Sequence, residues 1–198
     1  MLDEDDMASN SATQLASQQS IRAYVDTLGG AVLLDTIAIG ISTATIDIES
    51  VITPTYHTYL VTISQMQPAT DGARLIMRTS TDNGTTYNNG ASDYGWSQVT
   101  NGTAANDTTD TAMRLTENTG SGNQTEGLRG SIWIYNPTLA SDRTSVVATL
   151  LSKNSTGGIE AVHSVGERNV AEDNDAIRFL FNIGNVARMI ARVYGFKA

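Results

Sequence analysis

The sequence predicts a mainly β protein: an antiparallel β-sandwich or jelly roll with a short N-terminal α-helix. Three observations support this prediction. Apolar and polar residues alternate with a period of two in many short segments after residue 30. These segments are separated by Gly, Asn and Asp, which favour turns. A helical pattern occurs only before them. Short strands joined by such turns are typical of sandwiches. We therefore divide the 198 residues into an N-terminal region, 1–30, and a β-sandwich domain, 31–198.

The N-terminal region is an acidic arm followed by an amphipathic helix. The arm contains four neighbouring carboxylates at positions 3–6, whose mutual repulsion disfavours a packed element. The helix is expected to begin at Ser17 and to end at Gly29 and Gly30. Its apolar face, at spacings i, i+3, i+4 and i+7, consists of Ile21, Tyr24, Val25 and Leu28. Because about three helical turns are too few for stability alone in water, this face must dock on the chain's own body or on neighbouring copies.

Seven segments of the domain show the alternation most clearly, and each is predicted to be a strand. They are residues 46–49, 59–64, 75–77, 132–134, 146–151, 177–183 and 189–194. Several of them carry apolar residues on both faces, so their second face should be covered by another sheet, a loop or a subunit. Residues 83–127 are rich in Gly, Asn, Thr and Ser, and we expect long surface loops there with one or two short strands, including 112–115.

The composition argues against several classes of partner. The formal net charge is −9 without a basic stripe, which argues against binding to nucleic-acid phosphates and to anionic membrane surfaces. The sequence contains no cysteine, so disulfides and thiolate metal sites are excluded. His57 and His163 have no His, Cys or carboxylate at helical ligand spacing, so we predict no metal site and no cofactor. No secretory signal and no membrane-spanning apolar run are expected.

No catalytic motif stands out, and the protein is predicted not to be an enzyme. Nucleophile-elbow, P-loop and dinucleotide-binding signatures are missing from the sequence. Six carboxylates could in principle pair for glycoside hydrolysis, namely Asp71, Asp82, Asp93, Asp107, Asp110 and Glu117. Because any acidic chain of this size offers such pairs, a glycoside hydrolase ranks third among the alternative functions.

Two neighbouring aromatic residues leave two interpretations open. Tyr94 and Trp96 could stack on sugar rings if they were exposed on a loop, and the domain would then be a carbohydrate-binding module that recognises a host-surface glycan. Alternatively, Trp96 fills the end of the sandwich, because a chain with only two tryptophans usually buries most of both. The first interpretation makes receptor recognition the second-ranked function.

A local motif spans Ser80–Tyr87 and fits the pattern Ser-x-Asp-x-Gly-x-Thr-aromatic. It resembles the Asp-box of sialidases and other β-proteins, where the motif is a fold element away from the catalytic centre. Asp82 can accept hydrogen bonds across the turn, Gly84 can adopt a positive φ, and Tyr87 can pack back onto the sheet. We therefore expect a stabilising hairpin here.

The N-terminal region carries a more specific resemblance. Residues 6–9, 11–13 and 17–26 read Asp-Met-Ala-Ser, Ser-Ala-Thr and Ser-Gln-Gln-Ser-Ile-Arg-Ala-Tyr-Val-Asp. They closely resemble a segment that recurs in tailed-bacteriophage fibre and other virion proteins, just before a fibre or head domain. Residues 176–197 are similar to the closing hairpin of β-sandwich domains in phage structural proteins, in which an Arg-Phe strand, a Gly-Asn turn and a final strand ending in Tyr-Gly recur. The sequence departs from that pattern at residues 188–190, where small residues are commoner.

This resemblance implies a structural protein of the virion, made in the host bacterial cytoplasm. A short fibre, a spike and a capsid-decorating protein all fit the length, and analogy with fibres implies a homotrimer. Residues 1–30 would attach the protein to other virion proteins or to its sister copies, with Ile21, Tyr24, Val25 and Leu28 in the contact. The sandwich would project outward, where its loops could meet a host glycan.

Overall fold

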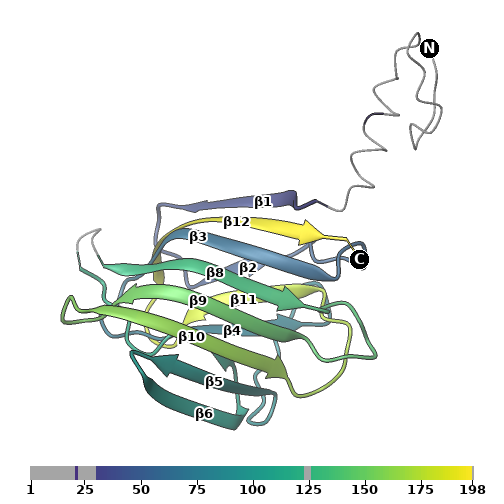
Figure 1. The fold of residues 1–198 in the computed structure, drawn as a ribbon. Helices are drawn as coiled ribbons and strands as arrows, with labels where there is room; N and C mark the ends of the chain where they lie inside the picture. Colours follow the sequence, from purple (N-terminus) through teal and green to yellow (C-terminus); the bar gives the residue numbers. More distant parts are fainter. Residues whose placement is uncertain (1–20, 22–29, 123–125, 198) are drawn as a thin grey trace.

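Twelve strands in two antiparallel sheets make up the described part of the molecule (Figure 1). The structure is a computed structural model and describes residue 21, residues 30–122 and residues 126–197. No helix occurs within residues 30–122 and 126–197. The prediction of a mainly β protein is therefore confirmed. The predicted N-terminal helix, apart from Ile21, lies outside the described residues.

The larger sheet has eight strands and the smaller sheet has four. In spatial order the larger sheet contains β1 (Val32–Ile39), β12 (Val186–Phe196), β3 (Thr58–Pro68), β8 (Gly127–Tyr135), β9 (Ser145–Lys153), β10 (Ile159–Arg168), β5 (Tyr94–Thr100) and β6 (Thr103–Asp110). The smaller sheet contains β2 (Thr45–Ile48), β11 (Ala176–Phe181), β4 (Leu75–Ser80) and β7 (Met113–Arg114). The chain therefore passes repeatedly from one sheet to the other.

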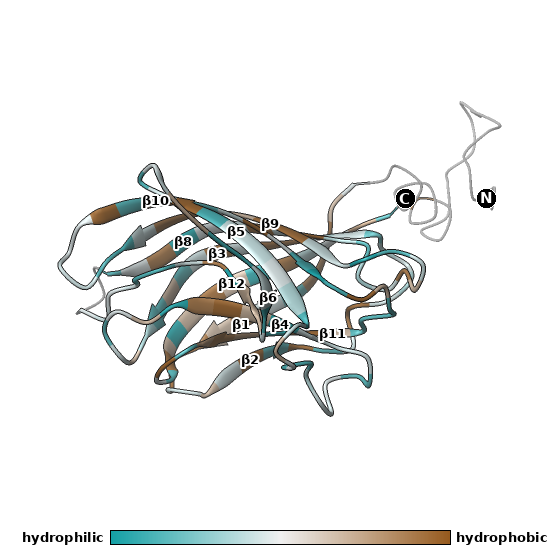
Figure 2. Cartoon of the chain, turned by 90° about the horizontal axis from the view of Figure 1, so that it is seen from below, coloured by the Kyte–Doolittle hydropathy of each residue, from teal (hydrophilic) through white to brown (hydrophobic). Residues whose placement is uncertain are grey.

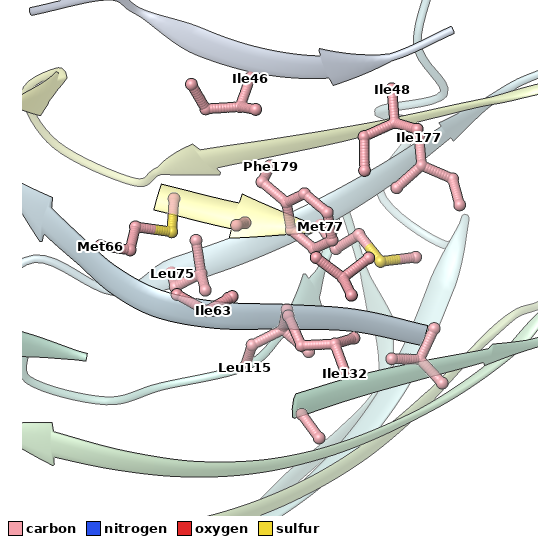
Figure 3. Packing of buried hydrophobic residues seen from close by; sticks show 14 of the residues in the cluster. Ile46, Ile48, Ile63, Met66, Leu75, Met77, Leu115, Ile132, Ile177 and Phe179 are labelled. Atoms are coloured by element: carbon pink, nitrogen blue, oxygen red, sulfur yellow. The ribbon is translucent and has the colours of Figure 1, made fainter. Parts of the chain in front are cut away.

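The two sheets pack face to face around one apolar core, and Figure 2 shows hydrophobic stretches on strands of both sheets. A buried row of paired residues on the larger sheet consists of Val193, Val61, Ile132 and Ala148. On the smaller sheet, Met77 pairs with Phe179, and both side chains are fully buried (Figure 3). Burial of these side chains is the main source of the fold's stability, because each apolar side chain removed from water contributes about 1.5–3 kcal/mol.

The predicted strands are found, but the middle of the chain differs from the prediction. Each of the seven alternating segments lies in or overlaps a strand, and the short strand expected at 112–115 is β7. The expectation of mainly loops over 83–127 is wrong, because β5 and β6 occupy much of this region and pair with each other. Strand β6 has only two apolar residues, the neighbours Ala104 and Ala105, so it shows no apolar alternation. Its position at the edge of the sheet explains why it needs none.

The C-terminal segment does not form the expected hairpin. Strand β11 pairs with β2 and β4 in the smaller sheet, whereas β12 pairs with β1 and β3 in the larger one. The turn between them, with Gly184 at a φ of +71°, carries the chain across the core rather than back along the same sheet. This placement makes β12 an inner strand of the larger sheet.

Candidate assembly surface

The outer face of the larger sheet carries a continuous apolar row. Because side chains alternate between the two faces of a strand, the residues next to the buried core positions point away from the core. Strand pairing aligns six of them in one line across neighbouring strands: Leu33, Tyr194, Leu60, Trp133, Val147 and Val165. None of these residues belongs to the buried core. We call this line the apolar row.

Further apolar side chains on the same face are open to solvent in the isolated chain, two or three outward positions along their strands from the apolar row. The exposed fractions are 52% for Leu33 and 41% for Val165, at the two ends of the apolar row. Ile190 on β12, Leu151 on β9 and Ile159 on β10 are exposed as well. An antiparallel sheet with one face in water normally presents polar residues there, and contiguous exposed apolar surface marks contact sites for other proteins.

Strand β10 departs most clearly from the usual pattern of apolar inward and polar outward residues. Its outward residues include Ile159 and Val165, whereas its inward residues include Glu160 and Ser164. The Ser164 hydroxyl donates a hydrogen bond to the Arg114 carbonyl at 3.1 Å, which satisfies this polar group inside the sandwich. The usual arrangement of apolar-in and polar-out is therefore inverted along part of the strand.

A polar row lies beside the apolar row. Pairing aligns Arg192, Thr62, Ser131, Thr149 and His163 across five neighbouring strands. Within it, Thr149 Oγ1 lies 3.2 Å from His163 Nδ1. Hydrogen-bonding groups and one guanidinium thus lie next to the apolar side chains. In protein–protein contacts, polar groups of this kind determine how the two partners are oriented.

One end of the apolar row opens into a hollow of about 550 Å³. Val147 and Val165 line it together with Gly95, which contributes no side chain, and Glu167 and Asp107 line it as well. A β-carbon added at Gly95 would meet its nearest neighbour, Asn169 Oδ1, at 3.5 Å, an ordinary contact distance. Polar residues, including Ser97 and Asn106, line the rest of the hollow, so its lining is partly apolar and includes two carboxylates.

The smaller sheet has a different outer face, which its own side chains close. Arg178 Nε and Nη2 on β11 donate to Asp47 Oδ1 and Oδ2 on β2, each at 2.6 Å. The Arg178 guanidinium lies 3.8 Å above the centre of the Tyr87 ring. The hydrogen bonds to Asp47 raise the pKa of Arg178, and burial together with the charges of Asp47 and Glu49 raises the pKa of the Tyr87 hydroxyl.

The Asp-box-like motif forms the turn that brings Tyr87 to this face. Asp82 Oδ1 accepts hydrogen bonds from Ser80 Oγ at 2.7 Å and from the Thr86 amide at 2.8 Å, and Gly84 has a φ of +82°. The bonds from Thr86 and Ser80 lower the pKa of Asp82. The role as a fold element is supported, but the expected hairpin is wrong, because the turn follows β4 of the smaller sheet and leads to β5 of the larger sheet.

Tyr94 and Trp96 are on β5 rather than on a loop, and both are buried. The Tyr94 hydroxyl accepts from the Thr79 amide at 2.8 Å, and burial raises its pKa. Trp96 Nε1 donates to Asp110 Oδ2 at 2.8 Å, while the Arg114 guanidinium lies 4.1 Å above the ring. The premise that these rings are exposed is corrected: they are packed in the sandwich and present no open face for a sugar. The alternative of a structural Trp96 is favoured.

Several of the remaining predicted site residues are engaged in salt bridges. Glu117 accepts salt bridges from Arg74 and Arg114, each at 2.9 Å, and Asp93 pairs with Arg168 at 2.9 Å. Among the described residues, no group of three or more His, Cys, Asp or Glu side chains could hold a metal ion. No helix in this part of the chain is long and apolar enough to cross a membrane. Of the predicted contact residues, Ile21 is 48% exposed, and Tyr24, Val25 and Leu28 lie outside the described residues.

Comparison with known proteins adds no family. No family model matches the sequence, and neither a characterised protein nor a solved structure matches it. The candidate site therefore depends on the geometry alone. The apolar row could have been found from the sequence as a face, because its strands are apolar on both sides, but the alignment of its members depends on strand order.

Proposed function

We propose that this chain is a structural protein of a tailed-bacteriophage virion. It is a short fibre, spike or head-decorating component that assembles as a homotrimer, and it is not an enzyme. The observation that carries the proposal is the apolar row on the outer face of the larger sheet, whose ends, Leu33 and Val165, are exposed and whose other members are only partly buried. A subunit that completes its structure by association has such a face, because covering it releases bound water.

The N-terminal region supplies attachment in this proposal. Residues 1–30 contain the motif that resembles phage virion proteins, and the predicted helix presents Ile21, Tyr24, Val25 and Leu28 on one side. The first described residue of the body, Gly30, leads directly into β1 at the edge of the larger sheet. The sandwich then projects from the particle while the N-terminal region holds it.

The test is incorporation into particles with and without residues 1–28. Phage particles would be assembled in the presence of tagged full-length or truncated chain, purified by density gradient and probed for the tag. We expect the truncated chain to be missing from the particles while its circular dichroism keeps the β signal of the full chain. Equal incorporation of both chains would contradict the attachment role, and absence of the full-length chain from particles would contradict the virion assignment.

A further inference from the structure

The outer face of the larger sheet divides into two halves of different shape. The β12 half, formed by β1, β12 and β3, carries the large side chains of the apolar row: Leu33, Tyr194 and Leu60. The β10 half, formed by β9, β10 and β5, carries Val147, Val165 and the hollow beside Gly95. One half thus presents large apolar side chains, and the other presents a depression of about 550 Å³ in which Val147 and Val165 supply apolar surface.

We infer that copies of this chain meet head to tail, with the β12 half of one copy packed against the β10 half of the next. The inference rests on the proposed homotrimer and names its contact. Leucine- and tyrosine-sized side chains of one copy enter the hollow of the next. Close packing of apolar groups is what makes such a contact stable, since an empty apolar depression at an interface forfeits dispersion contacts.

The charges of the two halves are complementary as well. Arg192 extends from the β12 half, and its partners in the polar row are uncharged. Glu167 and Asp107 line the hollow in the β10 half. Glu167 forms a salt bridge with Arg143, but both side chains are more than 40% exposed, so this bridge is weak and can be rearranged. Opposite charges on the two halves favour the packing of unlike halves over the packing of like halves.

The face is large enough for two contacts of modest size. Eight strands about 4.8 Å apart and roughly nine residues long cover on the order of 1,000 Å² in projection. Each head-to-tail contact uses one half of this area, roughly 500 Å² on each partner, which is below the about 800 Å² per partner of a standard protein interface. A copy in a closed ring makes two such contacts, so two neighbouring copies of the chain together cover the whole face.

Packing of unlike halves also fixes the symmetry. A contact between two different patches produces a closed ring when the rotation between copies closes, whereas a contact between identical patches produces a twofold dimer. The apolar row runs across the strands, so three copies with their strands along a threefold axis place their three rows in one layer. Trp133 and Leu60, near the middle of the row, lie closest to that axis.

The test uses site-directed cross-linking, and the chain is well suited to it because it contains no cysteine. Three variants of the full chain would be made: L33C in the β12 half, V165C in the β10 half, and I183C as the control. Ile183 is 47% exposed, similar to the other two, but it lies between β11 and β12 outside the face. Each variant, and each equimolar pair of variants, would be treated with a short bis-maleimide and analysed on a denaturing gel.

We expect a covalent dimer from the mixture of L33C and V165C and none from either alone. The double variant L33C/V165C should give a ladder that ends at the trimer, and mixtures with I183C should stay uncross-linked. Dimers from L33C alone or V165C alone would overturn the inference in favour of packing between like halves. A mixture without dimers, from chains whose circular dichroism matches the wild type, would also overturn it.

The outcome separates this inference from the proposed function. A chain that is found in particles as a trimer but fails the cross-linking test retains its proposed function and loses only the named contact. A chain that gives the expected ladder but is not found in particles retains the contact and loses the virion assignment.

Discussion

The outer faces of the two sheets differ in the side chains that they carry. On the smaller sheet, the charged groups find partners within the chain: Arg178 is held by Asp47 and covered by Tyr87. On the larger sheet, the apolar row is only partly buried, and Leu33 and Val165 at its ends remain exposed. The same fold thus has one face on which charged groups pair within the chain and one face with exposed apolar side chains. Under the proposed function, assembly would take place on the larger sheet.

The strongest test of this comparison places a charge in the apolar row. We expect V165E to dissociate the trimer, with a dissociation constant at least about 100-fold higher, because an unpaired charge buried in a contact costs roughly 3–5 kcal/mol. Light scattering should show the mass fall from three chains to one. The matched control is I183E, outside the face, which should leave the mass unchanged. A V165E protein that keeps the wild-type mass would remove the larger sheet from the assembly model.

A second test fills the hollow without adding charge. We expect G95L to weaken association by about 30-fold, since overpacking a contact costs roughly 2 kcal/mol. The stability of the single chain should change little, because a β-carbon at this position meets its neighbours at ordinary distances. Sedimentation equilibrium in the ultracentrifuge over a range of concentrations measures association, and urea unfolding measures the stability of the chain. If association is unchanged while the chain folds normally, no partner side chain occupies the hollow.

Local features of the strands could be predicted from the sequence, whereas their pairing could not. Strands with apolar inward residues, such as Ile177–Phe181, were predicted because their pattern is local. Strand β6 was missed because its only apolar residues, Ala104 and Ala105, are neighbours and form no alternating pattern. The hairpin expected over 176–197 was wrong because pairing partners are distant in sequence: Phe179 pairs with Met77 and not with a residue of β12. The apolar row could not be predicted for the same reason, because Leu60 and Trp133 become neighbours only through strand order.

A third test concerns the closed face of the smaller sheet. We expect R178A to lower the free energy of unfolding by about 1–2 kcal/mol, a value between those of an exposed ion pair and a buried hydrogen bond to a charged group. A double-mutant cycle of D47A and R178A should return a coupling energy close to about 1 kcal/mol. Because the proposal gives this face no part in assembly, the mass in solution should stay that of the wild type. Dissociation of R178A under conditions where it remains folded would show that both faces contribute to assembly.

The smallest expected effect belongs to the turn that supports the closed face. The hydrogen bonds from Thr86 and Ser80 lower the pKa of Asp82 in the folded chain relative to the unfolded chain. A lowered folded-state pKa means that the ionised carboxylate stabilises the fold above the unfolded-state value, near 3.9, and that this stabilisation is lost as pH falls through the lower folded-state value. D82N should therefore unfold at a slightly lower temperature than the wild type at pH 7. The difference between the two melting temperatures should narrow as the pH falls below about 4. Calorimetry of both proteins from pH 7 to pH 3 measures this difference in melting temperature. A difference that stays constant over this range would mean that the turn depends on the shape of the Asp82 side chain and not on its charge. The closed face would then be stabilised by the contacts among Arg178, Asp47 and Tyr87, without a contribution from the Asp82 charge.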